Sequence, residues 1–562
     1  MASVNVTIDD KEGAVPGDST VLEAARLLGV DIPTLCDHPA IEPIGACRMC
    51  LVEVQNQRAL QPACTFPVSE GMVVATESPK VQDARRFVLQ LLFSERNHYC
   101  MFCQMSGSCE LQDLAYRYGL DHWIFDRPFP KMPVDASRDY FAMDHNRCIL
   151  CRRCIRACDN LVGNGTLGLK HRGAQTMVIA DMDVPFGESS CVSCGTCLQV
   201  CPTGALMDRA SAYMGATKEI TRVKSSCNLC SVGCGVDLVV RGNRVIRVEG
   251  DWDAEPNEGL ICEIGRFHLL FDKRARVREP LVRGSSGMEV ATWEAALGKV
   301  ASELEAAGAK ACTVVSGYTC NETAAALRGL PGDKMLMEPA PDASTTTCLS
   351  ALDEADVVIV AGTDLTVNHQ VAGFAIKRGV RHRGVRLLLL AEGENGIDDW
   401  AFRKWAPAEA AKATAIAREA ESPVIVYTAG GEALAAELAA AIPEAQRVYL
   451  PAGGNTLGLA AAGITTAFQA NGATAYYVVA GEAKELAPEL RAALEGAHFV
   501  AVQASFREPW EGLADVILPS PLLFEKAGTV TTAEGREAHI AAAVQTPLKA
   551  EAQVVQELVT LL

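Results

Sequence analysis

The sequence predicts a cysteine-rich α+β N-terminal part followed by a large α/β domain. Of the 22 cysteines in the 562-residue chain, 19 precede residue 263 and fall into five groups. From about residue 295 cysteine nearly disappears, and short apolar segments alternate with helical segments rich in alanine and glycine. Strands interleaved with helices are typical of parallel α/β layers. We therefore expect metal ligands in the first half and a layered domain in the second.

The first segment has the pattern of a small mixed domain. A strand is expected at VNVTI, a turn at PGDS, a helix at TVLEAARLLGV and a second strand at CLVEV. Its four cysteines are Cys36, Cys47, Cys50 and Cys64. Plant-type [2Fe-2S] ferredoxins have a shorter first interval, so cysteine order and domain shape carry the prediction of a [2Fe-2S] site here. A four-cysteine zinc site is the alternative.

The second group adds a histidine. The stretch ARRFVLQLLFSE predicts a helix with arginines on one side and Val88, Leu91 and Leu92 on another. A compact set of possible ligands follows it: His98, Cys100, Cys103 and Cys109. Three cysteines lack a fourth thiolate, so we expect His98 to complete a [4Fe-4S] site. His122 or His145 is the alternative fourth ligand.

The third and fourth groups repeat the spacing C-x2-C-x2-C-x3-C. The first run is Cys148, Cys151, Cys154 and Cys158, and the second is Cys191, Cys194, Cys197 and Cys201, followed by Pro202. In bacterial two-cluster ferredoxins with this pattern, the fourth cysteine of each run binds the other [4Fe-4S] cluster. We therefore expect Cys201 to join Cys148, Cys151 and Cys154, and Cys158 to join Cys191, Cys194 and Cys197.

The fifth group comprises Cys227, Cys230, Cys234 and Cys262, with a strand hairpin expected before the last. It predicts a further [4Fe-4S] site, with zinc as the alternative. Zinc ribbons pair CxxC knuckles without a third close cysteine, which disfavours zinc for the doubled run. Disulfides are also disfavoured, because MASVNVTIDDKEG lacks the pattern of an export signal and reduced thiols in a cytoplasmic compartment fit metal sites.

Charge and hydropathy exclude two classes. A net charge of −18 argues against nucleic-acid binding, which depends on neutralising phosphates with Lys and Arg. No apolar stretch approaches the roughly 20 residues that span a bilayer. We therefore expect no nucleic-acid partner and no direct membrane span.

The second half offers strands but few ligands. Strands are expected at CTVVSG, ADVVIVAG, VRLLLLA, PVIVYTA, AYYVVAG, FVAVQAS and DVILP. The remaining thiols, Cys312, Cys320 and Cys348, are expected to be small buried apolar groups. Gly453 and Gly454 could cradle a phosphate, but a tight turn after RVYLPA is the expected use.

The order of these groups resembles the large iron-sulfur subunit of NADH-quinone oxidoreductase (complex I) and related subunits of NAD-linked hydrogenases and formate dehydrogenases. The resemblance rests on ERNH followed by three cysteines and ELQ, on the doubled run, and on C-x2-C-x3-C-x27-C followed by EIGRF. One departure is that only Tyr99 separates His98 from Cys100, where complex I members have three residues. The second half resembles a truncated molybdopterin oxidoreductase domain, through ADVVIVAGTD and FEKAGTVTTAEGR.

The resemblance implies a division of the chain into five parts. These are a β-grasp [2Fe-2S] ferredoxin-like domain over 1–80, a [4Fe-4S] segment with one histidine and three cysteines over 81–125, a two-[4Fe-4S] ferredoxin-like domain over 126–218, a [4Fe-4S] domain of molybdopterin-oxidoreductase type over 219–275, and an α/β molybdopterin-oxidoreductase-like domain over 276–562. Bound molybdenum is not expected, because the sequence offers little that would bind the metal or two pterin nucleotides.

The implied function is electron transfer within a complex, with no catalytic residue in this chain. One [2Fe-2S] and four [4Fe-4S] clusters would relay single electrons from an FMN/NADH-binding subunit and a small [2Fe-2S] subunit. The acceptor would be a quinone-reducing, hydrogenase or formate dehydrogenase module, in an assembly that could bifurcate electrons. The expected location is cytoplasmic, with attachment to the inner face of the membrane through partners left open. The alternatives are a molybdenum formate dehydrogenase and a zinc-stapled assembly protein.

Overall fold

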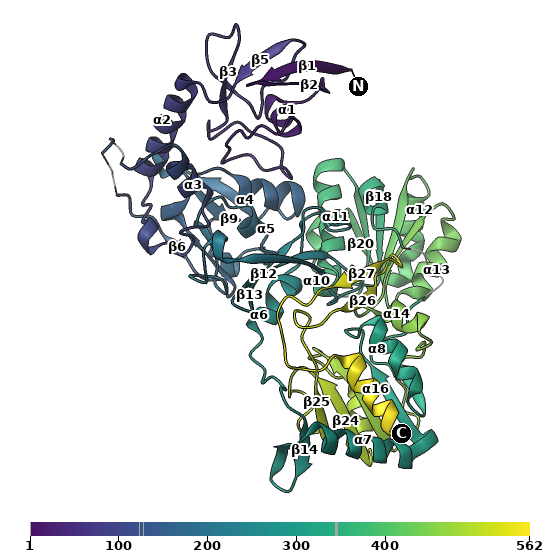
Figure 1. The fold of residues 1–562 in the computed structure, drawn as a ribbon. Helices are drawn as coiled ribbons and strands as arrows, with labels where there is room; N and C mark the ends of the chain where they lie inside the picture. The colour runs from purple at the N-terminus through teal and green to yellow at the C-terminus, as the bar shows by residue number, and fades with distance from the viewer. Residues whose placement is uncertain (1, 123, 127–128, 343–346) are drawn as a thin grey trace. The chain divides into compact units, whose positions relative to one another are not determined.

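The computed structural model describes residues 2–122, 124–126, 129–342 and 347–562 (Figure 1). The chain divides into two compact units, Met1–Ile220 and Thr221–Leu562. The first contains small mixed sheets and short helices around the cysteine groups, and the second contains two larger sheets covered by helices. The predicted fold class is confirmed.

The N-terminal sheet has the order β2-β1-β5-β3-β4. Its strands are β1 (Ser3–Ile8), β2 (Lys11–Pro16), β3 (Leu51–Val54), β4 (Gln61–Pro62) and β5 (Met72–Ala75). β1 pairs with β2 in antiparallel and with β5 in parallel orientation. Helix α1 (Val21–Leu27) begins with a capping box, in which Thr20 and Glu23 each satisfy a backbone N–H of the other. The buried side of α1 packs in the core of this sheet, as expected of a β-grasp domain.

Helix α2 (Pro79–Glu95) is present where the sequence predicts a helix, but its buried face differs from the expected one. Arg85 is completely buried on the same face as Leu89 and Phe93, whereas Leu91 is 44% exposed. The predicted separation of arginines from apolar residues is therefore wrong at these positions. Burial of Arg85 is tolerated because its guanidinium donates to the carbonyls of Met49 and Leu51.

The rest of the first unit is built from short elements around cysteine loops. They are α3 (Glu110–Arg117), α4 (Arg153–Arg156) and α5 (Thr196–Gln199), the sheet β10-β7-β6 (Leu206–Asp208, Phe141–Asp144, Val134–Asp135) and the hairpin β8-β9 (Leu167–Lys170, Met177–Ala180). The two short helices α4 and α5 occupy corresponding places in the two cysteine runs. The repeat in sequence is therefore a repeat in structure.

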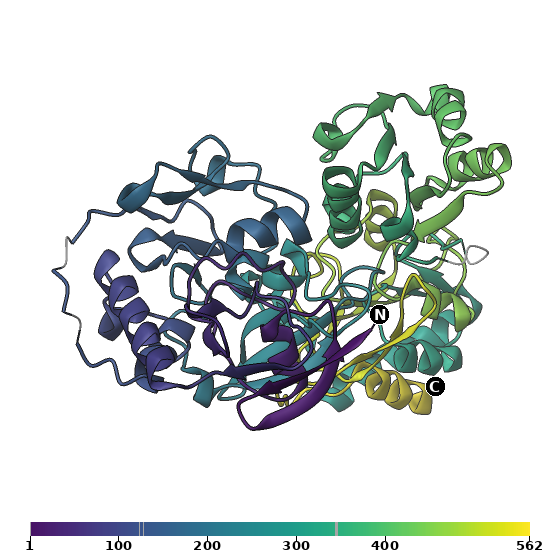
Figure 2. The ribbon, with the colours of Figure 1, turned by 90° about the horizontal axis from the view of Figure 1, so that it is seen from above.

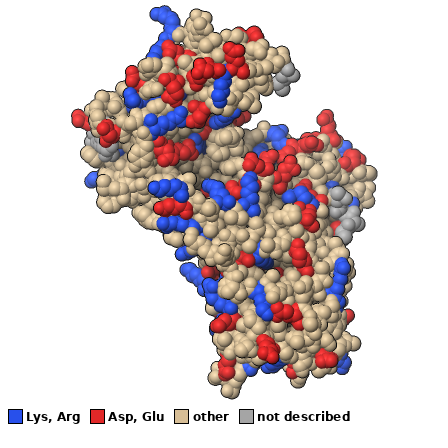
Figure 3. Space-filling view, viewed as in Figure 1, with Lys and Arg blue, Asp and Glu red and all other residues tan. Residues whose placement is uncertain are grey.

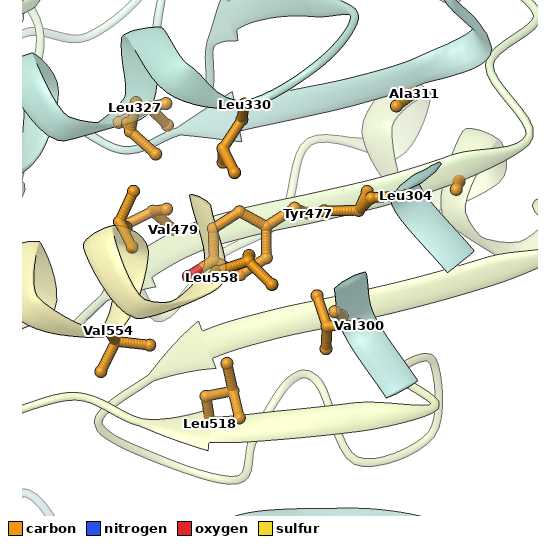
Figure 4. Close-up of a cluster of buried hydrophobic side chains, with 14 of the residues drawn as sticks. Val300, Leu304, Ala311, Leu327, Leu330, Tyr477, Val479, Leu518, Val554 and Leu558 are labelled. Atoms are coloured by element: carbon orange, nitrogen blue, oxygen red, sulfur yellow. The ribbon is translucent and has the colours of Figure 1, made fainter. Parts of the chain in front are cut away.

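The second unit begins with an antiparallel sheet, β11 (Thr221–Ser226), β12 (Gly235–Arg241) and β13 (Arg244–Gly250), which carries the fifth cysteine group. A seven-stranded sheet follows, in the order β15-β14-β25-β24-β23-β16-β17. These strands are β14 (Leu281–Gly284), β15 (Gly287–Val290), β16 (Ala311–Val315), β17 (Asp333–Leu336), β23 (Ala475–Gly481), β24 (Phe499–Ala504) and β25 (Val516–Pro519). The strands from β25 to β17 run parallel. On one face, helices α7 (Trp293–Ala307) and α16 (Glu551–Leu561) bury Val300, Leu304 and Leu558 against Tyr477 and its neighbours (Figure 4).

A second parallel sheet has the order β20-β19-β18-β21-β22. Its strands are β18 (Val357–Ala361), β19 (Arg386–Leu390), β20 (Arg403–Trp405), β21 (Pro423–Thr428) and β22 (Gln446–Leu450), with helices α11 (Gln370–Arg383), α12 (Ala410–Ala417) and α13 (Glu432–Ala441) beside them (Figure 2). All seven predicted strands are present. The sequence predicted parallel layers without showing that the strands belong to two separate sheets.

The surface carries acidic and basic side chains interspersed over the face seen in Figure 3. None of the helices among the described residues has the length and apolar character needed to cross a membrane.

Candidate metal centres

The first cysteine group forms two close pairs of sulfurs. The Sγ atoms of Cys50 and Cys64 are 3.4 Å apart, and the backbone N–H groups of Cys36 and Cys47 each donate to the other's Sγ at 3.3 and 3.4 Å. The hydrogen bond from Cys47 lowers the pKa of Cys36 to about 6, and its counterpart raises the pKa of Cys47. The contact between Cys50 and Cys64 likewise raises the pKa of Cys50 and lowers that of Cys64. Two pairs of sulfurs match the two irons of a [2Fe-2S] rhomb.

The second group lies around one cavity. His98, Cys100, Cys103 and Cys109 all line it, together with Phe93 and Gly204. Burial raises the pKa of the Cys109 thiol to about 12. Of the alternative fourth ligands, the side chain of His122 is 73% exposed and contacts Asp121. His145 is buried, but it is not among the residues that line this cavity. The geometry thus places His98, rather than either alternative, with the three cysteines.

The size of this cavity depends on a glycine. A Cβ built on Gly204 would lie 2.8 Å from the Sγ of Cys103, a distance that real Cβ atoms essentially never show. Gly204→Ala is therefore expected to push Cys103 out of place and remove one [4Fe-4S] signal, measured by iron content and EPR of anaerobically prepared protein. Gly168→Ala is the matched control, because a Cβ there meets nothing within 4 Å. Equal cluster content in both variants would contradict this reading of the cavity.

The two cysteine runs of the third and fourth groups have the same loop conformation. In the first run Leu150 and Arg152 have φ of 53° and 61°, and in the second Ser193 and Gly195 have φ of 52° and 71°. The N–H groups of Leu150 and Ser193 each donate at 3.4 Å to the first sulfur of their run. Left-handed residues at these positions let the chain turn tightly around a group, with N–H bonds directed at sulfur.

Cys158 lies with the cysteines of the other run. One cavity is lined by Cys158 and by Cys191, Cys194 and Cys197, with Gly195 and Phe186 also in its wall. Cys201 in turn lies close enough to Cys148, Cys151 and Cys154 for its charge to raise the pKa of each, in addition to the dominant effect of burial. The structure therefore brings together the two exchanged sets that the spacing predicts.

Two arginines between the cysteines join neighbouring sets. Arg156 donates to the carbonyl of Cys36 and, at 3.4 Å, to that of Cys151. Arg153, whose side chain is 3% exposed, forms a two-pronged ion pair with Glu110 at 2.7 and 2.9 Å, directly after Cys109. The loops of three sets, those of Cys36, Cys109 and Cys151, are thus tied to one helix, α4. Sequence reasoning missed both residues, although the sequence shows Arg153 between Cys151 and Cys154 and Arg156 between Cys154 and Cys158.

The fifth group also encloses a cavity, lined by Cys227, Cys230, Cys234 and Cys262. Burial, and less strongly the charges of Cys262 and Glu482, raise the pKa of Cys227 to about 12. A Cβ on Gly265 would lie 3.5 Å from the Sγ of Cys227 and 3.8 Å from that of Cys262. The backbone here therefore approaches two sulfurs as closely as ordinary contact allows.

Gly454, with its neighbour Gly453, lies against the loop that carries Cys227. They form a bend between β22 and helix α14 (Thr456–Ala461), and Gly453 has φ of 77°. A Cβ on Gly454 would lie 1.8 Å from the carbonyl oxygen of Asn228, next to Cys227. The predicted tight turn is present, and its small residues allow close packing on the cysteine loop.

The donor sets fit iron-sulfur clusters. Each set offers four soft or imidazole donors, and the third to fifth groups surround cavities or enclosed loops where burial raises the pKa of the thiols. Thiols of raised pKa must lose their protons to ligate iron, so cluster binding would release protons. Among the described residues, no three His, Cys, Asp or Glu side chains converge closely enough to hold a single metal ion.

The three remaining thiols do not share one environment. Cys312 and Cys320 are buried, as expected. Cys348 is exposed, and its sulfur lies 3.1 Å from the hydroxyl of Ser350, so the expectation of burial is wrong there. Its neighbours Thr347 and Leu349 are buried instead, which turns the side chain between them outward.

Five family models match successive parts of the chain. They are described as a 2Fe-2S iron-sulfur cluster binding domain (residues 1–79), an NADH-ubiquinone oxidoreductase-G iron-sulfur binding region (85–123), a 4Fe-4S dicluster domain (129–205), a molybdopterin oxidoreductase Fe4S4 domain (220–271) and a molybdopterin oxidoreductase (434–558). Iron-sulfur domains of both the 2Fe-2S and 4Fe-4S kinds are therefore present.

Curated relatives cover different shares of the chain. A subunit of NADH-quinone oxidoreductase from Rhizobium meliloti is 31% identical over 70% of this chain and 48% of its own length. The alpha subunit of an NADPH-Fe(3+) oxidoreductase of Geobacter sulfurreducens is 29% identical over 69% of this chain and 48% of its own length. NADH-quinone oxidoreductase subunit 3 of Thermus thermophilus is 28% identical over 95% of this chain and 79% of its own length. The chain spans about half the length of the first two.

A solved chain of an NAD+-reducing [NiFe]-hydrogenase matches 38% of this chain and 91% of its own, at 35% identity and a TM-score of 0.36. The relatives and the domain order together bear out the resemblance predicted from cysteine spacing. This chain is similar to subunits of NADH-quinone oxidoreductase.

Proposed function

We propose that the chain is an iron-sulfur electron-transfer subunit of a multisubunit NAD(P)H-linked oxidoreductase. It relays single electrons between a flavin (FMN) subunit and a downstream acceptor. The observation that carries the proposal is that α4 ties three ligand sets together through Arg153 and Arg156. A chain that only needed metal for stability would have no reason to hold separate sites on one element.

The five donor sets define the proposed clusters. One [2Fe-2S] cluster is held by Cys36, Cys47, Cys50 and Cys64, and four [4Fe-4S] clusters by the His98 set, the two exchanged sets and the Cys227 set. Such clusters, when bound, supply one-electron redox chemistry at potentials set by charge, hydrogen bonds to sulfur and exposure. The protein contributes the N–H donors of Leu150 and Ser193, the positive charge of Arg156 and the exclusion of water from buried sulfurs.

The second unit supports the relay as a scaffold. We propose that it carries the cluster of the Cys227 set and no molybdenum, because the sequence offers little that would bind the metal or two pterin nucleotides. The proposed partners are an FMN/NADH-binding subunit and a small [2Fe-2S] subunit. The relatives are named for quinone and Fe(3+) as acceptors, so the acceptor is the part of such complexes that varies. A hydrogenase or formate dehydrogenase module is the second candidate for it.

The test is the composition and reduction of the protein prepared without oxygen. We expect about 18 iron atoms and about 18 inorganic sulfides per chain, no stoichiometric molybdenum, and EPR signals that NADH produces only when the flavin subunit is added. A colourless protein containing zinc and no sulfide would overturn the proposal. Stoichiometric molybdenum would replace the scaffold role with a catalytic one.

A further inference from the structure

Three charged side chains are buried together in the second unit. Glu482 follows β23, Glu551 begins α16, and Lys526 precedes β26 (Gly528–Thr531). Their side chains are 2%, 2% and 4% exposed. The Nζ of Lys526 lies 3.4 Å from Glu482 and 3.7 Å from Glu551. We call these residues the Lys526 triad.

The Lys526 triad holds more negative than positive charge when all three groups are ionised, because two carboxylates face one ammonium. Burying an uncompensated charge is costly, which shifts the balance of one carboxyl from the ionised toward the protonated form. Burial raises the pKa of Glu482. Glu551 accepts from the hydroxyl of Ser520 at 2.5 Å through Oε1, while its Oε2 has no hydrogen-bond partner among the described residues.

One carbonyl connects the Lys526 triad to a cysteine loop. The carbonyl oxygen of Tyr318 accepts from the Nζ of Lys526 at 3.0 Å and from the side-chain amide of Asn228 at 2.9 Å. Asn228 is fully buried and follows Cys227 directly. The negative charge of Glu482 raises the pKa of the Cys227 thiol, less strongly than burial does. A change of charge at the cysteine set must therefore be felt at the Lys526 triad, and the reverse.

Other titratable groups around the Lys526 triad come from neighbouring elements. These are Cys320 and Glu322 at the start of helix α8 (Asn321–Ala326), Tyr318 after β16, Tyr477 on β23, and Glu338, which faces Tyr318. Glu338 is the rival proton site, because burial raises its pKa to about 7. The carboxylate of Glu338 accepts from the hydroxyl of Ser316 and the N–H of Gly317, whereas in the Lys526 triad the Oε2 of Glu551 accepts from no group among the described residues.

We propose that the Lys526 triad takes up one proton when the cluster held by Cys227, Cys230, Cys234 and Cys262 is reduced, and so makes the potential of that cluster depend on pH. The inference rests on the proposed function. A one-electron iron-sulfur donor would supply the electron to the bound cluster, and one carboxylate of the Lys526 triad would take one proton from solvent water and become the acid. Oxidation returns both. The added negative charge favours the neutral carboxyl, because like charges at close range disfavour ionisation.

The test is a redox titration of the full-length, cluster-loaded chain, followed by EPR at several pH values. The signal of interest is the one that Cys234→Ala removes. In the unsubstituted protein its midpoint potential is expected to fall as pH rises, by up to about 59 mV for each tenfold drop in proton activity. In Glu482→Gln the potential is expected to stay near the low-pH value throughout, since the amide holds the neutral charge. Glu551→Gln removes the same excess charge and serves if Glu482→Gln does not fold.

The matched control is Glu525→Gln, which makes the same substitution beside Lys526 at a carboxylate paired with Arg276. It is expected to keep the slope of the unsubstituted protein. A midpoint potential that does not change with pH in the unsubstituted protein would overturn the inference while leaving the proposed function intact. The same holds if the potential still falls with pH in both Glu482→Gln and Glu551→Gln. A slope lost only in Glu338→Gln would overturn it too, by assigning the proton to Glu338. Absence of any such EPR signal in the unsubstituted protein would instead refute the cluster assignment.

Discussion

Cys158→Ala is expected to remove the [4Fe-4S] cluster of Cys191, Cys194 and Cys197 and to spare the cluster of its own run. The physical reason is that Cys158 lines the cavity of the second set, so its loss leaves three ligands there. The first run keeps Cys148, Cys151 and Cys154 and receives Cys201. Iron content should fall by about four atoms per chain, and one EPR signal should disappear.

The reciprocal variant makes this result decisive. Cys201→Ala lies in the second run but should remove the cluster of the first, so the two variants should lose different signals. Spectra in which each variant loses the cluster of its own run would show that the ligands are not exchanged. Loss of both clusters from either variant would show that the two sites fold only together.

Arg85→Met is expected to destabilise the packing of α2 against β3 by about 3–5 kcal/mol. The guanidinium donates to the carbonyls of Met49 and Leu51 at 3.0 and 2.9 Å and to the hydroxyl of Tyr118 at 2.7 Å. Methionine fills a similar volume but leaves these buried acceptors unpaired. Met49 also precedes Cys50, so the [2Fe-2S] loop should loosen with the helix.

Hydrogen exchange of the full-length protein measures this effect locally. Peptides that cover α2 and β3 should exchange faster in Arg85→Met, whereas peptides of the second unit should not change. Arg86→Met is the matched control, because Arg86 is half exposed and makes one backbone bond, to the carbonyl of Tyr118. Equal exchange in the two variants would mean that the buried guanidinium contributes no more than an exposed one.

The cysteine sets could be predicted from the sequence because their spacing is local and repeated. The left-handed residues Leu150, Arg152, Ser193 and Gly195 show that the spacing encodes a loop conformation as well as a list of ligands. The strands of the second unit could be predicted for a similar reason, since each is a short apolar run between helices.

The hydrogen-bond partners of long side chains could not be predicted in this way. Arg156 reaches carbonyls 114 and 120 positions away in sequence, at Glu42 and Cys36, and nothing in local periodicity indicates such a partner. Arginine is usually exposed, yet Arg85 is buried because groups outside its helix accept four hydrogen bonds from its guanidinium. The partition of strands into two sheets likewise depends on long-range pairing.

The exposure of the Cys348 thiol has a practical use. All 22 cysteines lie within the described residues, and Cys348 is the one whose side chain is exposed. A maleimide dye or a gold surface should therefore react at a single point on the cluster-loaded chain. Immobilised through that thiol, every molecule would present the same orientation to an electrode, and voltammetry could follow its redox centres without a mediator.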